Sequence, residues 1–168
     1  MLIAAAIKLD SQGPVFFRQA RKGWSGRVFH IWKFRSMFVH QPQAGVVQQA
    51  TRNDPRVTRV GAFLRRTSLD ELPQLFNVLR GDMSFIGPRP ETPATVARLN
   101  ASLRGYELRH RVKPGLTGWS QAMGQWGARD EAHRLAYDLY YVRHRSVALD
   151  AQVLLRTLSV VLLGGAGR

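Results

Sequence analysis

The sequence contains no cysteine among its 168 residues, which excludes disulfide bonds and thiolate metal sites. Its five histidines do not stand at the spacing of a zinc site. It also lacks a clean apolar run of the roughly 20 residues that a transmembrane helix needs. Residues 1–7 are apolar but too short to span a bilayer, and polar residues interrupt the apolar segment 148–163. No signal peptide is evident, because a charged start and a cleavage site are missing.

Acidic residues are scarce. The sequence has 11 Asp and Glu against 25 Lys and Arg, which gives a formal net charge of +14. This charge predicts an anionic partner. Nucleic acid, an anionic membrane surface and anionic small substrates all fit this charge. Because zinc-finger spacing and an RNA-recognition signature are missing, we expect no nucleic-acid partner. A non-catalytic basic module that binds nucleic acid or a membrane remains the alternative function.

Two adjacent carboxylates, Asp70 and Glu71, stand out in this basic chain. Ser68 and Glu71 have the spacing of a capping box, and apolar residues recur at helical spacing from Leu72 to Leu79. The pattern predicts a helix over residues 69–80 that ends at Gly81. Both carboxylates would lie in its first turn, where phosphate also binds. They can be caps, metal ligands or a nucleophile.

Cationic side chains occur in several segments around this pair. Arginine clamps, a helix N-terminus and a carboxylate pair are the parts needed to hold a diphosphate with a divalent metal. These cations can form a diphosphate site only if the fold brings their segments together. The cations concerned are Lys33, Arg35, Arg65, Arg66, Arg89, Arg111 and Lys113.

Short motifs follow one another along nearly the whole chain. They are residues 7–19 (IKLDSQGPVFFRQ), 33–37 (KFRSM), 53–61 (NDPRVTRVG), 67–74 (TSLDELPQ), 81–90 (GDMSFIGPRP), 111–121 (RVKPGLTGWSQ), 137–142 (YDLYYV) and 149–150 (LD). In this order the chain resembles the bacterial sugar transferases of the monotopic phosphoglycosyl transferase family. The number of matching segments makes the resemblance specific.

The resemblance implies transfer of a sugar 1-phosphate from a UDP-sugar to a polyprenyl phosphate such as undecaprenyl phosphate, with release of UMP. Asp70 and Glu71 fall on the family's catalytic pair. Asp70 would be the nucleophile that forms a phosphosugar-aspartyl intermediate, since a carboxylate can attack phosphorus. Glu71 would hold Mg²⁺. The expected substrate contacts are Arg65, Arg89, Lys33, Arg35, Arg111 and Gln121.

The resemblance also implies a membrane-bound reaction that initiates exopolysaccharide, capsule, O-antigen or glycoconjugate synthesis. Family members carry a hydrophobic helix that enters the membrane, and we expect residues 1–9 to be the remnant of it. The expected location is the cytoplasmic face of the bacterial inner membrane, with the protein monotopic or peripheral.

We expect residues 1–168 to form one domain, an α+β fold that is mainly α. Residues 15–17 and 28–32 predict a small β-hairpin, and residues 40–53 a mobile loop. The glycine-rich segment 115–127 predicts a structured loop and no strand. The expected helices cover residues 57–66, 92–103, 129–145 and 148–163, and the last of these is amphipathic and core or interfacial.

Overall fold

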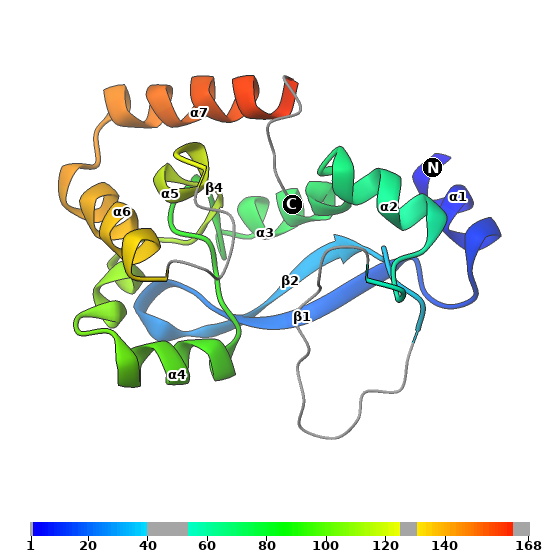
Figure 1. Cartoon of the computed structure of the whole chain (residues 1–168), viewed down its shortest axis with the longest axis horizontal. Helices are drawn as coiled ribbons and strands as arrows, with labels where there is room; N and C mark the ends of the chain where they lie inside the picture. Colours follow the sequence, from blue (N-terminus) through cyan, green and yellow to red (C-terminus); the bar gives the residue numbers. More distant parts are fainter. Residues whose placement is uncertain (1, 40–53, 125–130, 163–168) are drawn as a thin grey trace.

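The computed structural model of the chain describes residues 2–39, 54–124 and 131–162. Helices make up most of its regular structure, as the sequence predicts, and two small sheets complete an α+β fold (Figure 1). The predicted loop at 40–53 lies outside the described residues, as does the end of the predicted loop 115–127.

The predicted hairpin is confirmed and is longer than expected. Strand β1 (Phe16–Lys22) pairs antiparallel with β2 (Val28–Phe34), in a register that runs from Phe16 opposite Phe34 to Lys22 opposite Val28. The short 3₁₀ helix η1 (Trp24–Gly26) connects the two strands. Gly26 closes this turn with a φ of 71°, a conformation that glycine adopts without strain.

Helix α1 (Leu2–Asp10) precedes the hairpin, and α2 (Arg59–Arg66) packs against α1. The Asp10 carboxylate accepts a hydrogen bond from the Val60 amide at 3.0 Å, which joins the two helices. The Thr58 side chain caps α2 by accepting from the Gly61 amide. A Cβ on Gly61 would lie 2.0 Å from the Ser36 carbonyl oxygen, so this close approach requires glycine.

The segment with the adjacent carboxylates is helical, but the predicted single α-helix over residues 69–80 is wrong in its first half. A 3₁₀ helix, η2 (Leu69–Gln74), leads into the short helix α3 (Leu75–Leu79). Ser68 has a left-handed backbone with φ of 58°, and its side chain makes no capping hydrogen bond. The predicted capping box does not form, because the Glu71 carboxylate pairs with two cations instead.

The prediction of a loop without a strand after residue 114 is wrong, because a second small sheet includes residues 115–117. Strand β3 (Ser84–Ile86) pairs in parallel with β4 (Gly115–Thr117), and helix α5 (Trp119–Ala122) follows. A Cβ on Gly115 would lie 2.1 Å from the Gly87 amide nitrogen. The glycines that suggested a loop are therefore the residues that allow the two backbones to approach.

The remaining helices are α4 (Pro93–Ser102), the 3₁₀ helix η3 (Tyr106–Arg111), α6 (Glu131–His144) and α7 (Val147–Leu162). Helices α4, α6 and α7 agree with the predicted segments 92–103, 129–145 and 148–163, whereas η3 was not predicted. The Thr92 side chain caps α4 by accepting from the Thr95 amide. A core cluster joins α4, η3 and α6. Its buried members are Val96, Leu99, Tyr106 and Leu135.

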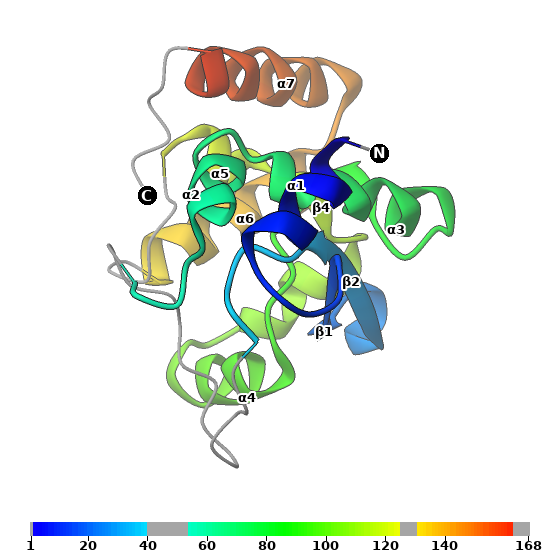
Figure 2. The ribbon, with the colours of Figure 1, turned by 90° about the vertical axis from the view of Figure 1, so that its right-hand side faces the viewer.

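Helix α7 and helix α4 lie at opposite ends of the molecule in both views, and α7 lies over α5 (Figures 1 and 2). Leu149 and Val153 of α7 are buried, whereas Leu154, Leu155 and Leu158 are exposed. This arrangement confirms that the helix is amphipathic. Within the described ranges 2–39, 54–124 and 131–162, every helix is too short or too polar to cross a bilayer.

Candidate functional site

Asp70 and Glu71 lie in η2 against strand β2, and both are buried, with 4% and 7% of their surface exposed. Lys33 approaches from β2, where its Nζ lies 2.7 Å from Glu71 Oε1 and 4.0 Å from Asp70 Oδ2. Arg89 comes from the segment after β3 and places Nη2 3.0 Å from the same Glu71 oxygen. One carboxylate oxygen is therefore shared by two cations from distant parts of the chain.

Asn77 fixes the carboxylate-bearing segment to the strand that carries Lys33. Its side chain is fully buried in α3, where Oδ1 accepts from the Trp32 amide at 3.1 Å. Its Nδ2 donates to the His30 carbonyl at 2.8 Å. These two bonds satisfy backbone groups of β2 and join α3 to the strand that carries Lys33.

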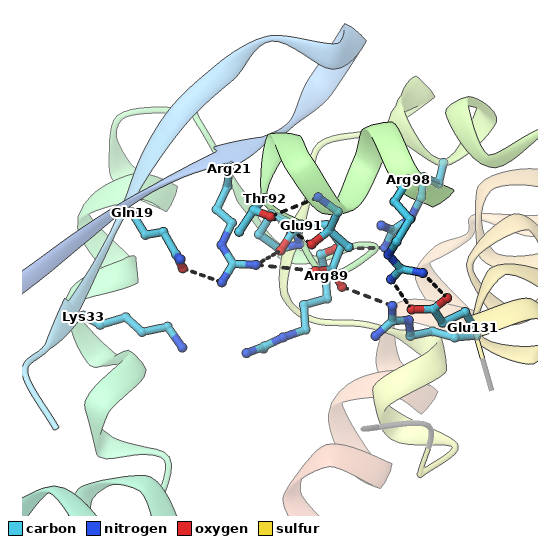
Figure 3. A network of polar contacts seen from close by, with 12 residues as sticks. Gln19, Arg21, Lys33, Arg89, Glu91, Thr92, Arg98 and Glu131 are labelled. Atoms are coloured by element: carbon cyan, nitrogen blue, oxygen red, sulfur yellow. Dashed lines mark hydrogen bonds and ion pairs between the residues drawn. The ribbon is translucent and has the colours of Figure 1, made fainter. Parts of the chain in front are cut away.

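The loop that carries Arg89 is held by hydrogen bonds from three directions. The Gly87 amide donates to the Thr117 carbonyl at 2.9 Å. Arg21 of β1 donates to the Pro90 carbonyl at 3.0 Å, and Arg109 of η3 donates to the Arg89 carbonyl at 2.8 Å. Figure 3 shows the Arg89 side chain extending from this loop towards Lys33. The backbone is thus fixed while the guanidinium faces the carboxylates.

The charges of the site stabilise one another. Burial acts to raise the pKa of the Glu71 carboxyl, but Arg89 and Lys33 outweigh burial and hold that pKa well below its usual range. Glu71 in turn raises the pKa of Arg89. Burial lowers the pKa of Lys33, and Glu71 opposes this effect. At neutral pH Glu71 is therefore ionised and Arg89 is charged.

The structure brings together four of the residues that the sequence singled out, namely Lys33, Asp70, Glu71 and Arg89. Arg65 lies half-buried in the last turn of α2, a few residues before Asp70. The catalytic roles of Asp70 and Glu71 stay predictions, as do the substrate contacts of Lys33, Arg65 and Arg89.

Arg35, Arg111 and Gln121 lie in other surroundings. Arg35 is 5% exposed, and its guanidinium donates to Ser11 Oγ, to the Ser11 carbonyl and to the Pro14 carbonyl. Arg111 is exposed at the end of η3. Gln121 is buried in α5, and within the described part of the chain its Oε1 has no hydrogen-bond partner. The substrate contacts predicted for these three residues stay predictions.

Sequence reasoning missed the residues that hold the Arg89 loop. Arg21 pairs with Glu91 at 3.5 Å, and Arg109 pairs with Asp138 at 2.7 Å. The partners are 70 and 29 positions apart, so no local spacing connects them. The basic composition also hid these two arginines among many others.

The donor set at the predicted magnesium position fits a hard cation, because Asp70 and Glu71 offer adjacent buried carboxylates. Among the residues that the structure describes, no group of three or more His, Cys, Asp or Glu could hold a metal. Mg²⁺ is usually bound by one or two carboxylates together with substrate phosphates and water. The residues therefore fit an ion that is held jointly with a diphosphate.

A separate hollow of about 280 Å³ lies between the hairpin turn, α4 and η3. Its lining includes Lys22, His110 and Arg111. Burial, together with Arg109 and Lys22 nearby, lowers the pKa of His110 to about 4. His110 is therefore neutral at pH 7.

His110 predicts a loss of stability in weak acid. An unfolded histidine has a pKa of about 6.5, so below that pH the unfolded chain binds a proton at His110 while the folded chain leaves it unprotonated. The stability that His110 contributes is complete above about pH 6.5 and is lost as the pH falls to about 4. We expect His110→Gln to flatten this decline in urea unfolding measured between pH 7.5 and 4.5. An unchanged slope in the variant would contradict the prediction.

Comparison with known proteins identifies the class. The family model for bacterial sugar transferases matches residues 1–164. The chain therefore belongs to the bacterial sugar transferase family. It is 52% identical over 160 residues to the UDP-glucose:undecaprenyl-phosphate glucose-1-phosphate transferase of Escherichia coli K12. The match covers 93% of this chain and 34% of that protein.

Two further relatives support this placement. The undecaprenyl-phosphate glucose phosphotransferase of Komagataeibacter xylinus is 49% identical, over 94% of this chain and 31% of its own length. The exopolysaccharide production protein PSS of Rhizobium leguminosarum bv. phaseoli is 41% identical, over 99% of this chain and 87% of its own. The chain thus spans about a third of the length of the first two relatives and most of the third.

Proposed function

We propose that the protein transfers a sugar 1-phosphate from a UDP-sugar to a polyprenyl phosphate, with undecaprenyl phosphate the expected carrier. UDP-glucose is the first donor to test, because two relatives of about 50% identity carry glucose in their names. The observation that supports the proposal best is the buried Asp70–Glu71 pair with Lys33 and Arg89 converging on it. Together these four side chains would provide a nucleophile and cations for phosphate within one site.

In the proposed first step, the Asp70 carboxylate attacks the phosphorus that bears the sugar. An acyl phosphate bond forms, the bond between the two phosphates breaks, and UMP leaves with the bridging oxygen. In the second step a phosphate oxygen of the polyprenyl phosphate attacks the same phosphorus. The Asp70 carboxylate is released, and the product is a polyprenyl diphosphate sugar. Carboxylates act as such nucleophiles in other phosphoryl transfers.

The neighbouring residues would position and neutralise phosphate oxygens, which is most of what phosphoryl transfer requires from a protein. Arg89 and Lys33 lie where they can clamp the diphosphate, since both already bind an anionic oxygen of Glu71. Glu71 is proposed to hold Mg²⁺, with Asp70 beside it. When bound, this ion would lower the negative charge of the diphosphate.

The membrane surface is the proposed location, at the cytoplasmic face of the inner membrane. Helix α3 follows η2, which carries the carboxylate pair, and exposes Leu75, Phe76 and Leu79. Exposed apolar side chains of this kind insert into the interface between headgroups and acyl chains, and the net charge of +14 favours anionic lipids. A polyprenyl phosphate would then present its headgroup next to Asp70.

A vesicle experiment tests this location. We expect Phe76→Ser with Leu79→Ser to reduce co-sedimentation with vesicles of phosphatidylglycerol and phosphatidylethanolamine about tenfold, because about 57% and 83% of these side chains are exposed. The matched control is Val28→Ser with Val147→Ser, two exposed apolar residues on other elements. Equal binding of both double variants and the original chain would contradict a role for α3.

A donor panel tests the function. The chain is incubated with Mg²⁺, undecaprenyl phosphate in detergent and one of several UDP-sugars, and UMP release is measured. Release with at least one UDP-sugar that depends on the lipid phosphate supports the proposal. If no donor yields UMP while the chain binds duplex DNA tightly at moderate salt, the transferase proposal fails for this chain.

A further inference from the structure

A buried ion pair lies outside the carboxylate site, between Arg109 of η3 and Asp138 of α6. Both side chains are 2% exposed, and Arg109 Nη2 lies 2.7 Å from Asp138 Oδ2. The other oxygen of Asp138 accepts from Ser120 Oγ of α5 at 2.8 Å. Arg109 Nη1 also donates to the Tyr106 hydroxyl at 2.6 Å. The guanidinium is thus held by Tyr106 of its own helix and by Asp138 of α6, which Ser120 of α5 holds in turn.

The same nitrogen of Arg109 that binds Asp138 also donates to the Arg89 carbonyl at 2.8 Å. Arg89 uses its side chain to bind Glu71, 3.0 Å away. A continuous series of contacts therefore runs from Asp138 through Arg109 and Arg89 to Glu71. The buried pair sits at one end of this series and the proposed catalytic pair at the other.

A buried ion pair gives little net stability, because desolvation offsets most of the attraction between the charges. The geometry of Arg109 points to a more specific role. Its planar fork reaches Tyr106, Asp138 and the Arg89 backbone in different directions at once. Lysine has a single ammonium on a flexible stem and cannot reproduce this arrangement.

We propose that Arg109 is a positioning residue for the transfer reaction, which sets the backbone of Arg89 and so directs the Arg89 guanidinium to Glu71 and to substrate phosphate. Asp138 and Ser120 hold Arg109 in its orientation. This inference rests on the proposed function for its kinetic consequence. Its structural part, the fixing of the Arg89 loop, does not depend on activity.

The kinetic test is Arg109→Lys, which keeps the charge beside Asp138 but loses the fork. We expect kcat to fall about tenfold or more while KM for the UDP-sugar changes less than about threefold, since misplacement of a clamp by a fraction of an ångström affects the transition state most. The matched control is Arg98→Lys, in the surface pair with Glu131, where we expect no change. If Arg109→Lys raised KM and left kcat unchanged, the proposal would be overturned.

A double-variant cycle separates positioning from general damage. If Arg109 acts through Arg89, then Arg109→Lys costs little further activity in a chain that already carries Arg89→Ala. Independent losses that multiply would overturn the proposal. If Arg109→Lys does not fold, Asp138→Asn takes its place, because the amide keeps the volume and weakens the hold on Arg109.

Hydrogen exchange supplies a measurement without catalysis. We expect Arg109→Lys to speed amide exchange in the peptide covering residues 84–91, and Arg98→Lys to leave it unchanged. Unchanged exchange in Arg109→Lys would overturn the proposed fixing of the Arg89 loop. If the unaltered chain releases no UMP but exchange rises in the variant, the proposed function fails while the positioning of Arg89 stands.

Discussion

Asp70→Asn is expected to reduce UMP release by about a thousandfold or more, as removal of a covalent nucleophile does in other enzymes. The amide keeps the size of the buried side chain, which is 4% exposed, but cannot attack phosphorus. The measurement is lipid-dependent UMP release at saturating donor. Incubation with a donor labelled on the sugar-bearing phosphate should also label the unaltered chain and leave Asp70→Asn unlabelled.

The control for this variant is Asp10→Asn, in which the side-chain oxygen can still accept from the Val60 amide. We expect this control to keep its activity and its melting temperature. If Asp70→Asn retained near-normal turnover, Asp70 could not be the nucleophile. Loss of activity together with persistent labelling of the chain would assign the nucleophile to another residue.

Glu71→Gln is expected to damage both stability and activity, because Lys33 and Arg89 then lose the negative charge they share. Breaking a buried ion pair at one partner costs about 3 kcal/mol, since the remaining charges stay buried without compensation. We expect the free energy of unfolding in urea to fall by about this amount. UMP release should fall and should need more Mg²⁺ to reach its maximum.

The surface pair provides the control for Glu71→Gln. Glu131→Gln removes the charge that pairs with Arg98, whose side chain is 55% exposed, so solvent compensates and little change is expected. A Glu71→Gln variant as stable as the original chain would contradict the stabilising role of the Glu71 charge. A variant with normal activity and an unchanged Mg²⁺ requirement would remove Glu71 as the proposed metal ligand.

The sequence could predict the elements whose causes are local. The hairpin alternates β-forming residues about a glycine turn, and Thr92 caps α4 as its place before Pro93 indicates. The carboxylate pair and Arg89 were visible because each stands in a distinct motif. The class of transferase also followed from the motifs, and the family comparison confirms it.

The errors have long-range causes. The capping box at Ser68 fails because Glu71 is drawn to Lys33 and Arg89, which lie 38 and 18 positions away. Strand β4 was missed because its glycine is explained only by the backbone of Gly87 beside it. The anchoring of Arg89 by Arg109 depends on α6 as well. Contacts between distant segments leave no period or spacing in the sequence.

The close packing of backbones beside Arg89 has a consequence for how such a chain tolerates change. Added Cβ atoms on Gly87, Gly115 or Gly118 would lie 2.1 to 2.3 Å from neighbouring backbone atoms. In a library of all single substitutions, these positions would reject every side chain almost as strictly as Asp70, although they carry no chemical group. Intolerance to substitution in this chain therefore maps the scaffold of the site as well as its reactive groups.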